Sequence, residues 1–200
     1  MTNVTICSDP AYAEVLTELR DRSLKPTAVR KLVTKLTAIL SKDATAKQPI
    51  QLDEQIAIVV VLRSGLAMTE AFVDSLPEEA NTVIYHLGLF REKHTLQPVE
   101  YYNKLPPKNP RIKRAFILDP LIATGGTAQA AISILKDWGV ESVTFYSILA
   151  SEEGIKSAAL AWPEGSSFVV GHVDPELDAK GYVQPGVGDI GDRLFGTQLD

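Results

Sequence analysis

The stretch from Asp119 to Thr127 combines one carboxylate with a glycine-rich turn. It lies between a short apolar run, Ala115–Leu118, and a run with helical spacing, residues 128–138. A strand, a tight turn and a helix are therefore expected. Such a turn directs free backbone N–H groups toward one point beside the positive end of a helix dipole. That arrangement suits a phosphate, whereas the carboxylate of Asp119 suits sugar hydroxyls, so we predict a ligand with both a phosphate and a ribose.

The turn differs from two common nucleotide-binding motifs, since both Gly-Lys-Ser/Thr and Gly-x-Gly-x-x-Gly are absent. The alternative is that this turn connects a strand to a helix without binding a ligand. Asp119 and the flanking Thr124 and Thr127 argue against that alternative.

A helix dipole contributes only about 0.3–1 kcal/mol, whereas micromolar binding needs about 8 kcal/mol. Other cations must therefore converge on the ligand. Arg63 and Arg91 are the candidates because each follows a predicted strand, although a single such arginine is more often a surface residue.

The segment Gly181–Thr197 contains five glycines. A chain of this kind can bring its own backbone close to a ligand, and exposed N–H and C=O groups can recognise the edge of a flat heterocycle. Tyr182, Leu194 and Phe195 are candidate anchors for it. The alternative is a floppy C-terminus in which the two aspartates are ordinary turn residues.

Composition narrows the class of protein. The chain has 200 residues, a hydrophobic fraction of 45% and a formal net charge of −5. These values suit one α/β domain with a full core and argue against a nucleic-acid surface, which normally carries a dense basic patch. The single Cys7 excludes an internal disulfide, and the three histidines show no metal-ligand spacing. No signal peptide or apolar run of transmembrane length is apparent, so we expect a cytoplasmic protein without membrane contact.

Strands and helices alternate along the chain. The expected helices are residues 11–22, 26–42, 66–75, 128–138 and 152–161, and the expected strands are residues 56–62, 82–87, 114–118, 143–149 and 167–170. Residues 43–54 are expected to be a loop, residues 88–110 a long connection whose Tyr101 and Tyr102 form an arm or lid, and residues 174–200 an irregular tail. The alternation predicts an α/β fold with a doubly wound, mostly parallel sheet. Ligands of such sheets lie beyond the carboxyl ends of the strands, which is where Arg63 and Asp119 fall.

Four motifs in this order resemble the type I phosphoribosyltransferases, and among them the uracil phosphoribosyltransferase branch. Asp119–Thr127 is similar to the loop that binds phosphoribosyl pyrophosphate (PRPP). Val61–Leu66 resembles the family's Leu-Arg-Ala-Gly-Leu segment, and Arg91–Pro106 resembles its arginine-containing arm. Gly181–Thr197 is similar to its uracil-binding segment. The resemblance covers residues 56–197, with a fainter match at Leu19–Asp21.

The resemblance implies conversion of uracil and PRPP to UMP and pyrophosphate with Mg²⁺, and it implies roles for particular residues. The implied catalytic residues are Asp119, Asp189 and Arg91. The implied PRPP-binding residues are Arg63, Arg91, Asp119, Pro120, Leu121, Ile122, Ala123, Thr124, Gly125, Gly126, Thr127 and Asp189. The implied uracil-binding residues are Val183, Gly188, Asp189 and Ile190. No side chain is expected to bind the metal directly: Mg²⁺ would be carried by PRPP, with a water-mediated contact to Asp189.

The resemblance also implies a single domain, a homodimer or larger homo-oligomer, and GTP as an effector. Residues 1–54 would form N-terminal helices and a short arm, residues 55–172 the PRPP-binding core, and residues 173–200 a small irregular hood over the base. The chain departs from the family pattern in its short 43–54 segment, at Val29-Arg30, at Glu92-Lys93-His94 and at Gln184. Two alternatives remain open: a PRPP- or nucleotide-sensing regulator without useful catalysis, and a phosphoribosyltransferase for another base.

Overall fold

A computed structural model describes residues 2–47, 53–92, 95 and 97–197, and excludes the side chains of Lys47 and Arg91. Within these residues the main sheet has eight strands in the order β1-β8-β7-β5-β2-β3-β4, with β6 paired to β7. Neighbouring strands are parallel except β3 and β4. The strands are β1 (Val4–Ile6), β2 (Gln55–Leu62), β3 (Asn81–Arg91), β4 (Pro98–Asn103), β5 (Ile112–Leu118), β6 (Leu121–Ile122), β7 (Ser142–Ser151) and β8 (Ser166–Asp174). The predicted doubly wound, mostly parallel α/β fold is confirmed.

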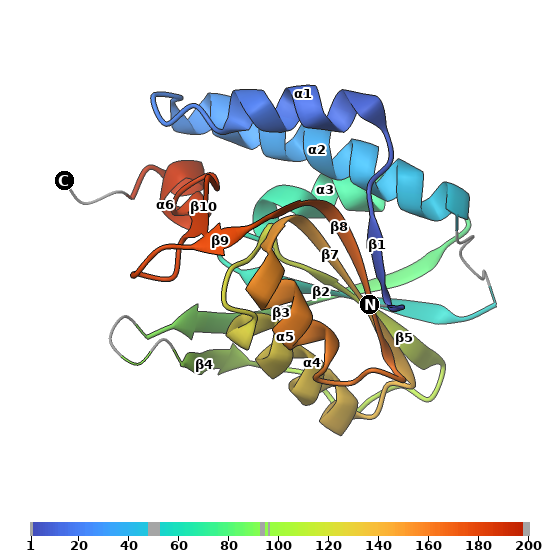
Figure 1. Cartoon of the computed structure of the whole chain (residues 1–200). Helices are drawn as coiled ribbons and strands as arrows, with labels where there is room; N and C mark the ends of the chain where they lie inside the picture. Colours follow the sequence, from blue (N-terminus) through green and yellow to red (C-terminus); the bar gives the residue numbers. More distant parts are fainter. Residues whose placement is uncertain (1, 48–52, 93–94, 96, 198–200) are drawn as a thin grey trace.

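Helices cover both faces of the sheet (Figure 1). Helices α1 (Pro10–Leu19), α2 (Pro26–Lys47) and α3 (Leu66–Val73) pack on one face, and α4 (Gly126–Trp138) and α5 (Glu152–Ala159) pack on the other. Strand β2 shows why its sequence is apolar throughout. Ile58 and Val60 pack with the first group of helices, whereas Val59 and Val61 pack with the second. Because side chains alternate between faces, a central parallel strand must be apolar at every position.

Several predicted helix ends are confirmed. Helix α2 begins at Pro26, where a missing N–H is harmless. Helix α4 ends before Gly139, which adopts a left-handed conformation with φ of 98°.

The loop predicted for residues 43–54 is wrong for residues 43–47, which continue α2. Ala44 extends the buried stripe of Leu36 and Leu40 by another turn, a tertiary contact that the polar composition conceals. Residues 48–52 lie outside the described part of the chain.

The predicted long connection at residues 88–110 is a hairpin in its first half. Strand β3 continues to Arg91, beyond the predicted end at Leu87, and the chain returns as the antiparallel strand β4. Pro98 is tolerated because it is the first residue of an edge strand. Tyr101 is exposed and its ring centroid lies 6.0 Å from that of Phe90 across the hairpin. Of the departure at Glu92-Lys93-His94, only Glu92 lies within the described residues.

The C-terminal tail is more ordered than predicted. Strand β8 extends to Asp174, followed by an antiparallel pair, β9 (Glu176–Leu177) and β10 (Val183–Gln184), and by helix α6 (Ile190–Phe195). Leu194 is buried in the same cluster as the first group of helices. Of the predicted hood at residues 173–200, the structure describes residues 173–197. Figure 1 shows this part of the hood beside the end of the sheet, next to α1 and α2. No helix in the described ranges combines the length and apolar character needed to cross a membrane.

Candidate active site

A cavity of about 530 Å³ opens at the carboxyl edge of the sheet. This volume lies in the range typical of small-molecule sites. Four separate segments form its wall: the turn after β2, the β3–β4 hairpin, the turn between β5 and α4, and the hood. The lining residues are Val61, Leu62, Arg63, Ser64, Leu89, Phe90, Tyr101, Asp119, Leu121, Ile122, Ala123, Thr124, Gly125, Thr127, Ala128, Tyr182, Gly188, Asp189, Ile190 and Gly191. The structure therefore brings the glycine-rich turn and the C-terminal glycines into one site.

The turn between β5 and α4 has the geometry expected of an anion site. Gly125 has φ of 86° and immediately precedes α4. A Cβ atom on Gly125 would lie 2.6 Å from the carbonyl oxygen of Gly154, so both the backbone conformation and the space require glycine. Thr124 and Thr127 line the cavity on either side of it. The amino end of α4 is thus presented beside the cavity, where its free N–H groups favour an anion.

Helix α5 supports this turn from behind. Ser151 Oγ donates a hydrogen bond to the carbonyl of Ala123 at 2.5 Å and accepts one from the N–H of Gly154 at 2.8 Å. A Cβ on Gly154 would lie 2.1 Å from the Ala123 carbonyl oxygen, so α5 and the turn are in close contact. Sequence reasoning missed Ser151 and Gly154. Ser151 was recognisable only as a helix N-cap before Glu152 and Glu153.

Asp119 lies at the floor of the cavity with 7% of its surface exposed. Burial raises the pKa of its carboxyl to about 7, although hydrogen bonds from Ser64 and from the backbone of Leu121 act to lower it. The Ser64 Oγ donates to Oδ1 at 3.1 Å. A ligand hydroxyl that donates to this carboxylate would favour its charged form. Sequence reasoning missed the role of Ser64. The available signal was its position next to the candidate residue Arg63.

Arg63 lines the cavity but already has partners in the hood. It donates hydrogen bonds to Asp192 Oδ1 and Thr197 Oγ1, each at 3.0 Å, and lies 5.7 Å from the ring centroid of Phe195. The side chains of Arg63 and Asp192 are 49% and 30% exposed, and such pairs are typically worth no more than about 1 kcal/mol. A phosphate ligand can therefore displace Asp192. The side chain of Arg91 lies outside the described residues, so its role stays a prediction.

Some of the other predicted site residues line the cavity, and some do not. Gly188, Asp189 and Ile190 line the cavity. Asp189 also caps α6 by accepting a hydrogen bond from the Asp192 N–H at 3.0 Å.

Among the described residues, Pro120, Gly126 and Val183 are not part of the cavity lining. The Pro120 carbonyl instead accepts hydrogen bonds from strand β7. Gly126 opens on a neighbouring cavity, and Val183 is buried in the core. Their predicted ligand contacts stay predictions.

The uracil phosphoribosyltransferase family model matches residues 46–197. The chain belongs to this family. The urg2 protein of Schizosaccharomyces pombe is 50% identical over 98% of this chain and 92% of its own length. The uracil phosphoribosyltransferase of Roseiflexus castenholzii is 39% identical over 98% of this chain and 100% of its own length.

Solved structures give the same picture of the fold. The AQ2163 protein of Aquifex aeolicus superposes with a TM-score of 0.86 at 29% identity, covering 98% of this chain and 100% of that one. A hypoxanthine-guanine phosphoribosyltransferase of Bacillus anthracis has a TM-score of 0.53 at 10% identity, over 74% of this chain and 81% of that one. At that identity the likeness concerns the fold alone, and it agrees with the expected type I phosphoribosyltransferase architecture.

Proposed function

We propose that this chain converts uracil and PRPP to UMP and diphosphate. The observation that carries the proposal is that one cavity joins Asp119 and four residues of the following turn, Ala123, Thr124, Gly125 and Thr127, to the hood residues Gly188–Ile190. Asp119 and the turn suit a ribose phosphate. In this proposal the backbone of Gly188–Ile190 recognises a flat base. Membership of the uracil phosphoribosyltransferase family supports uracil as that base.

The reaction breaks the bond between the anomeric carbon and a diphosphate oxygen and forms a bond from that carbon to a ring nitrogen of uracil. That nitrogen loses its proton, which passes to solvent or to the released diphosphate. As the carbon–oxygen bond breaks, positive charge develops on the sugar and negative charge on the diphosphate. In this proposal Asp119 accepts hydrogen bonds from ribose hydroxyls, residues 123–127 hold the 5′-phosphate, and Arg63 and Arg91 stabilise the leaving diphosphate. Carboxylates near the ring favour the cationic sugar. No covalent nucleophile is required.

Uracil would be distinguished by the backbone of Gly188–Ile190. A backbone N–H that donates to a uracil carbonyl would face the amino group of cytosine, which also donates. Two buried donors would then lack acceptors, and a site of this type rejects such a base strongly.

The residues present fit magnesium as an ion carried by the substrate. Among the described residues, no group of three or more His, Cys, Asp and Glu is placed to hold a metal by itself. Mg²⁺ commonly keeps several waters and uses one or two carboxylates together with substrate phosphates. Asp189, which lines the cavity, would hold the ion through water. The bound ion would neutralise charge on the diphosphate.

The direct test mixes the purified protein with PRPP, Mg²⁺ and either uracil, cytosine, hypoxanthine or adenine, and measures mononucleotide by chromatography. UMP from uracil alone is expected. Tight PRPP binding without any nucleotide product would instead favour the sensing regulator. A nucleotide made from another base would identify the other phosphoribosyltransferase.

Three further features of the family are part of this proposal. They are GTP as an activator, assembly into a homodimer or larger homo-oligomer, and the division into N-terminal helices (residues 1–54), PRPP-binding core (55–172) and base-binding hood (173–200). Their support is the family likeness.

Asp192→Asn is expected to strengthen PRPP binding by up to about fivefold. In the free protein Asp192 competes for Arg63, and removing its charge removes that competition, which is worth about 1 kcal/mol or less. Calorimetric titration with PRPP measures the change. Asp192→Glu keeps the charge and serves as the control, for which no gain is expected. Weaker PRPP binding in Asp192→Asn would contradict the competition.

A further inference from the structure

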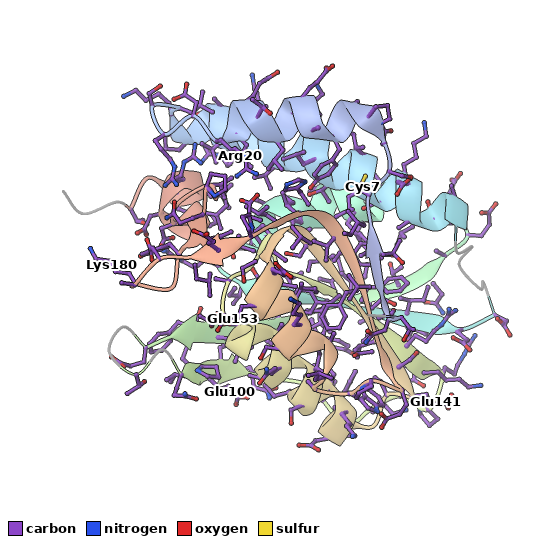
Figure 2. The ribbon with its side chains drawn as sticks, in the orientation of Figure 1. Cys7, Arg20, Glu100, Glu141, Glu153 and Lys180 are labelled. Atoms are coloured by element: carbon purple, nitrogen blue, oxygen red, sulfur yellow. The ribbon has the colours of Figure 1, made fainter. Side chains whose placement is uncertain are left out.

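Arginines fasten the hood to the N-terminal helices. Arg20, which follows α1, lies between that helix and the hood (Figure 2). It donates one hydrogen bond to each carboxylate oxygen of Asp174 at 2.8 Å, and another to the Gly186 carbonyl at 2.9 Å. Asp174 also accepts from the Gly186 N–H at 2.9 Å. Arg20 and Asp174 therefore hold both polar groups of the Gly186 backbone.

Arg193 makes the reverse connection, from α6 to the end of α1. Its guanidinium donates to the carbonyls of Leu19 at 2.8 Å, Val187 at 2.6 Å and Asp21 at 2.6 Å. The residue is 7% exposed, and its Nε is buried without a partner in the described part of the chain. All three hydrogen bonds thus go to backbone carbonyls. Two of these lie at the carboxyl end of α1, where the helix dipole favours a cation.

A buried guanidinium of this kind contributes little to the free energy of folding. Desolvation of a charge is unfavourable, and an apolar side chain of similar size often does as well or better. Arg193 instead fixes local geometry, because the donors of its planar guanidinium hold three carbonyl groups in place.

One of these carbonyls belongs to the peptide that precedes the cavity wall. The peptide group between Val187 and Gly188 is planar and trans, so its carbonyl and its N–H point in opposite directions. Holding the Val187 carbonyl on Arg193 therefore also sets the direction of the Gly188 N–H. Arg22 packs against the same residue, since a Cβ on Gly188 would lie 2.0 Å from Arg22 Nη1. Gly188 lines the cavity, followed by Asp189 and Ile190.

We propose that Arg193 and Arg20 are positioning residues for base recognition: they orient the backbone of residues 186–190 so that its peptide groups meet the edge of the base. This role rests on the function proposed above. The N-terminal helices thereby take part in choosing the base, although none of their residues lines the cavity among those described.

The test compares the full chain with its Arg193→Met variant in steady-state UMP synthesis and in calorimetric titrations with UMP. We expect KM for uracil and Kd for UMP to rise about tenfold or more, where tenfold corresponds to about 1.4 kcal/mol. KM for PRPP should rise less, because the proposed phosphate contacts at residues 123–127 do not depend on Arg193. Guanidinium ion at a non-denaturing concentration should restore uracil KM in Arg193→Ala, whereas choline at equal ionic strength should not.

Arg114→Met is the matched control. Arg114 forms an ion pair with Glu54 at 2.9 Å near the amino end of β5, away from the cavity. Its loss should lower stability and leave both KM values unchanged.

If Arg193→Met fails to fold, Arg20→Lys tests the positioning role instead. Lysine keeps a charge beside Asp174 but loses the fork that also reaches Gly186, so uracil KM should rise about threefold. Unchanged uracil KM and UMP affinity in the folded variants would overturn the inference. Absence of UMP synthesis in the wild-type protein would instead overturn the proposed function, and the UMP titration would still test the positioning.

Discussion

Asp119→Asn should lower kcat/KM for PRPP by about 100-fold or more. Asparagine has the same shape as aspartate, so the cavity is preserved, but the acceptor loses its charge and one of its oxygens. Hydrogen bonds to charged groups contribute about 1.5–3 kcal/mol each, and the loss of about 2.7 kcal/mol corresponds to 100-fold. Initial rates of UMP formation over a range of PRPP concentrations measure the effect. Ser64→Ala, which removes a hydrogen bond to Asp119 but not the carboxylate, should show a smaller loss.

The same variant should change how stability depends on pH. Burial raises the pKa of Asp119 to about 7 from an ordinary value of 3.8. Between these pH values the folded chain holds a proton that the unfolded chain has released. The stabilising effect of that proton is complete below the unfolded pKa and is lost as pH rises through about 7. Asparagine does not titrate, so the variant is not subject to this loss.

Melting temperatures of both proteins without ligand, measured between about pH 4 and pH 8, test the linkage. The melting temperature of the variant minus that of the wild type should increase as pH rises and should level off above about pH 8. Other titrating groups are common to both proteins and cancel in this difference. A difference that is constant over the whole range would show that the Asp119 carboxyl does not hold its proton near neutrality.

Asp189→Asn should lower kcat by about 100-fold while leaving the fold intact. Asp189 lines the cavity and caps α6 through one side-chain oxygen. Asparagine is about as good a helix cap as aspartate, so α6 should persist. In the proposed function, the charge that disappears is the one that lies near the reacting sugar and the metal carried by PRPP. Loss of one preorganised electrostatic contact commonly lowers kcat by about 100- to 1,000-fold.

Asp189→Ala separates the two roles of this residue. It removes both charge and cap, so it should show a similar fall in kcat together with about 1 kcal/mol of lost stability. Circular dichroism and thermal unfolding report the stability, and UMP formation reports kcat. Turnover at the wild-type rate in Asp189→Asn would contradict the catalytic role, whatever the stability of Asp189→Ala.

Local patterns in the sequence were sufficient for most of the sheet and for the turn beside α4. Apolar runs such as Ile56–Leu62 are recognisable because a strand buried on both faces has no polar position. Gly125 and Gly139 are recognisable because left-handed conformations favour glycine. The prediction failed where contacts between distant segments decide the structure. Residues 43–47 are helical, residues 88–91 extend a strand, and the supposedly irregular tail forms β9, β10 and α6.

The sequence by itself determined the α/β fold, the order of its motifs and the family to which they belong. Each of these follows from the types and spacing of neighbouring residues, which a single segment carries. Only the tertiary structure decided that the hood and the turn at residues 123–127 share one cavity, that burial brings the pKa of Asp119 to about 7, and that Arg63 is paired with Asp192 in the free protein. It also decided that Arg20 and Arg193 join α1 to the hood. Burial, field and pairing depend on groups far apart in the chain, and these meet only when the sheet and its helices have packed together.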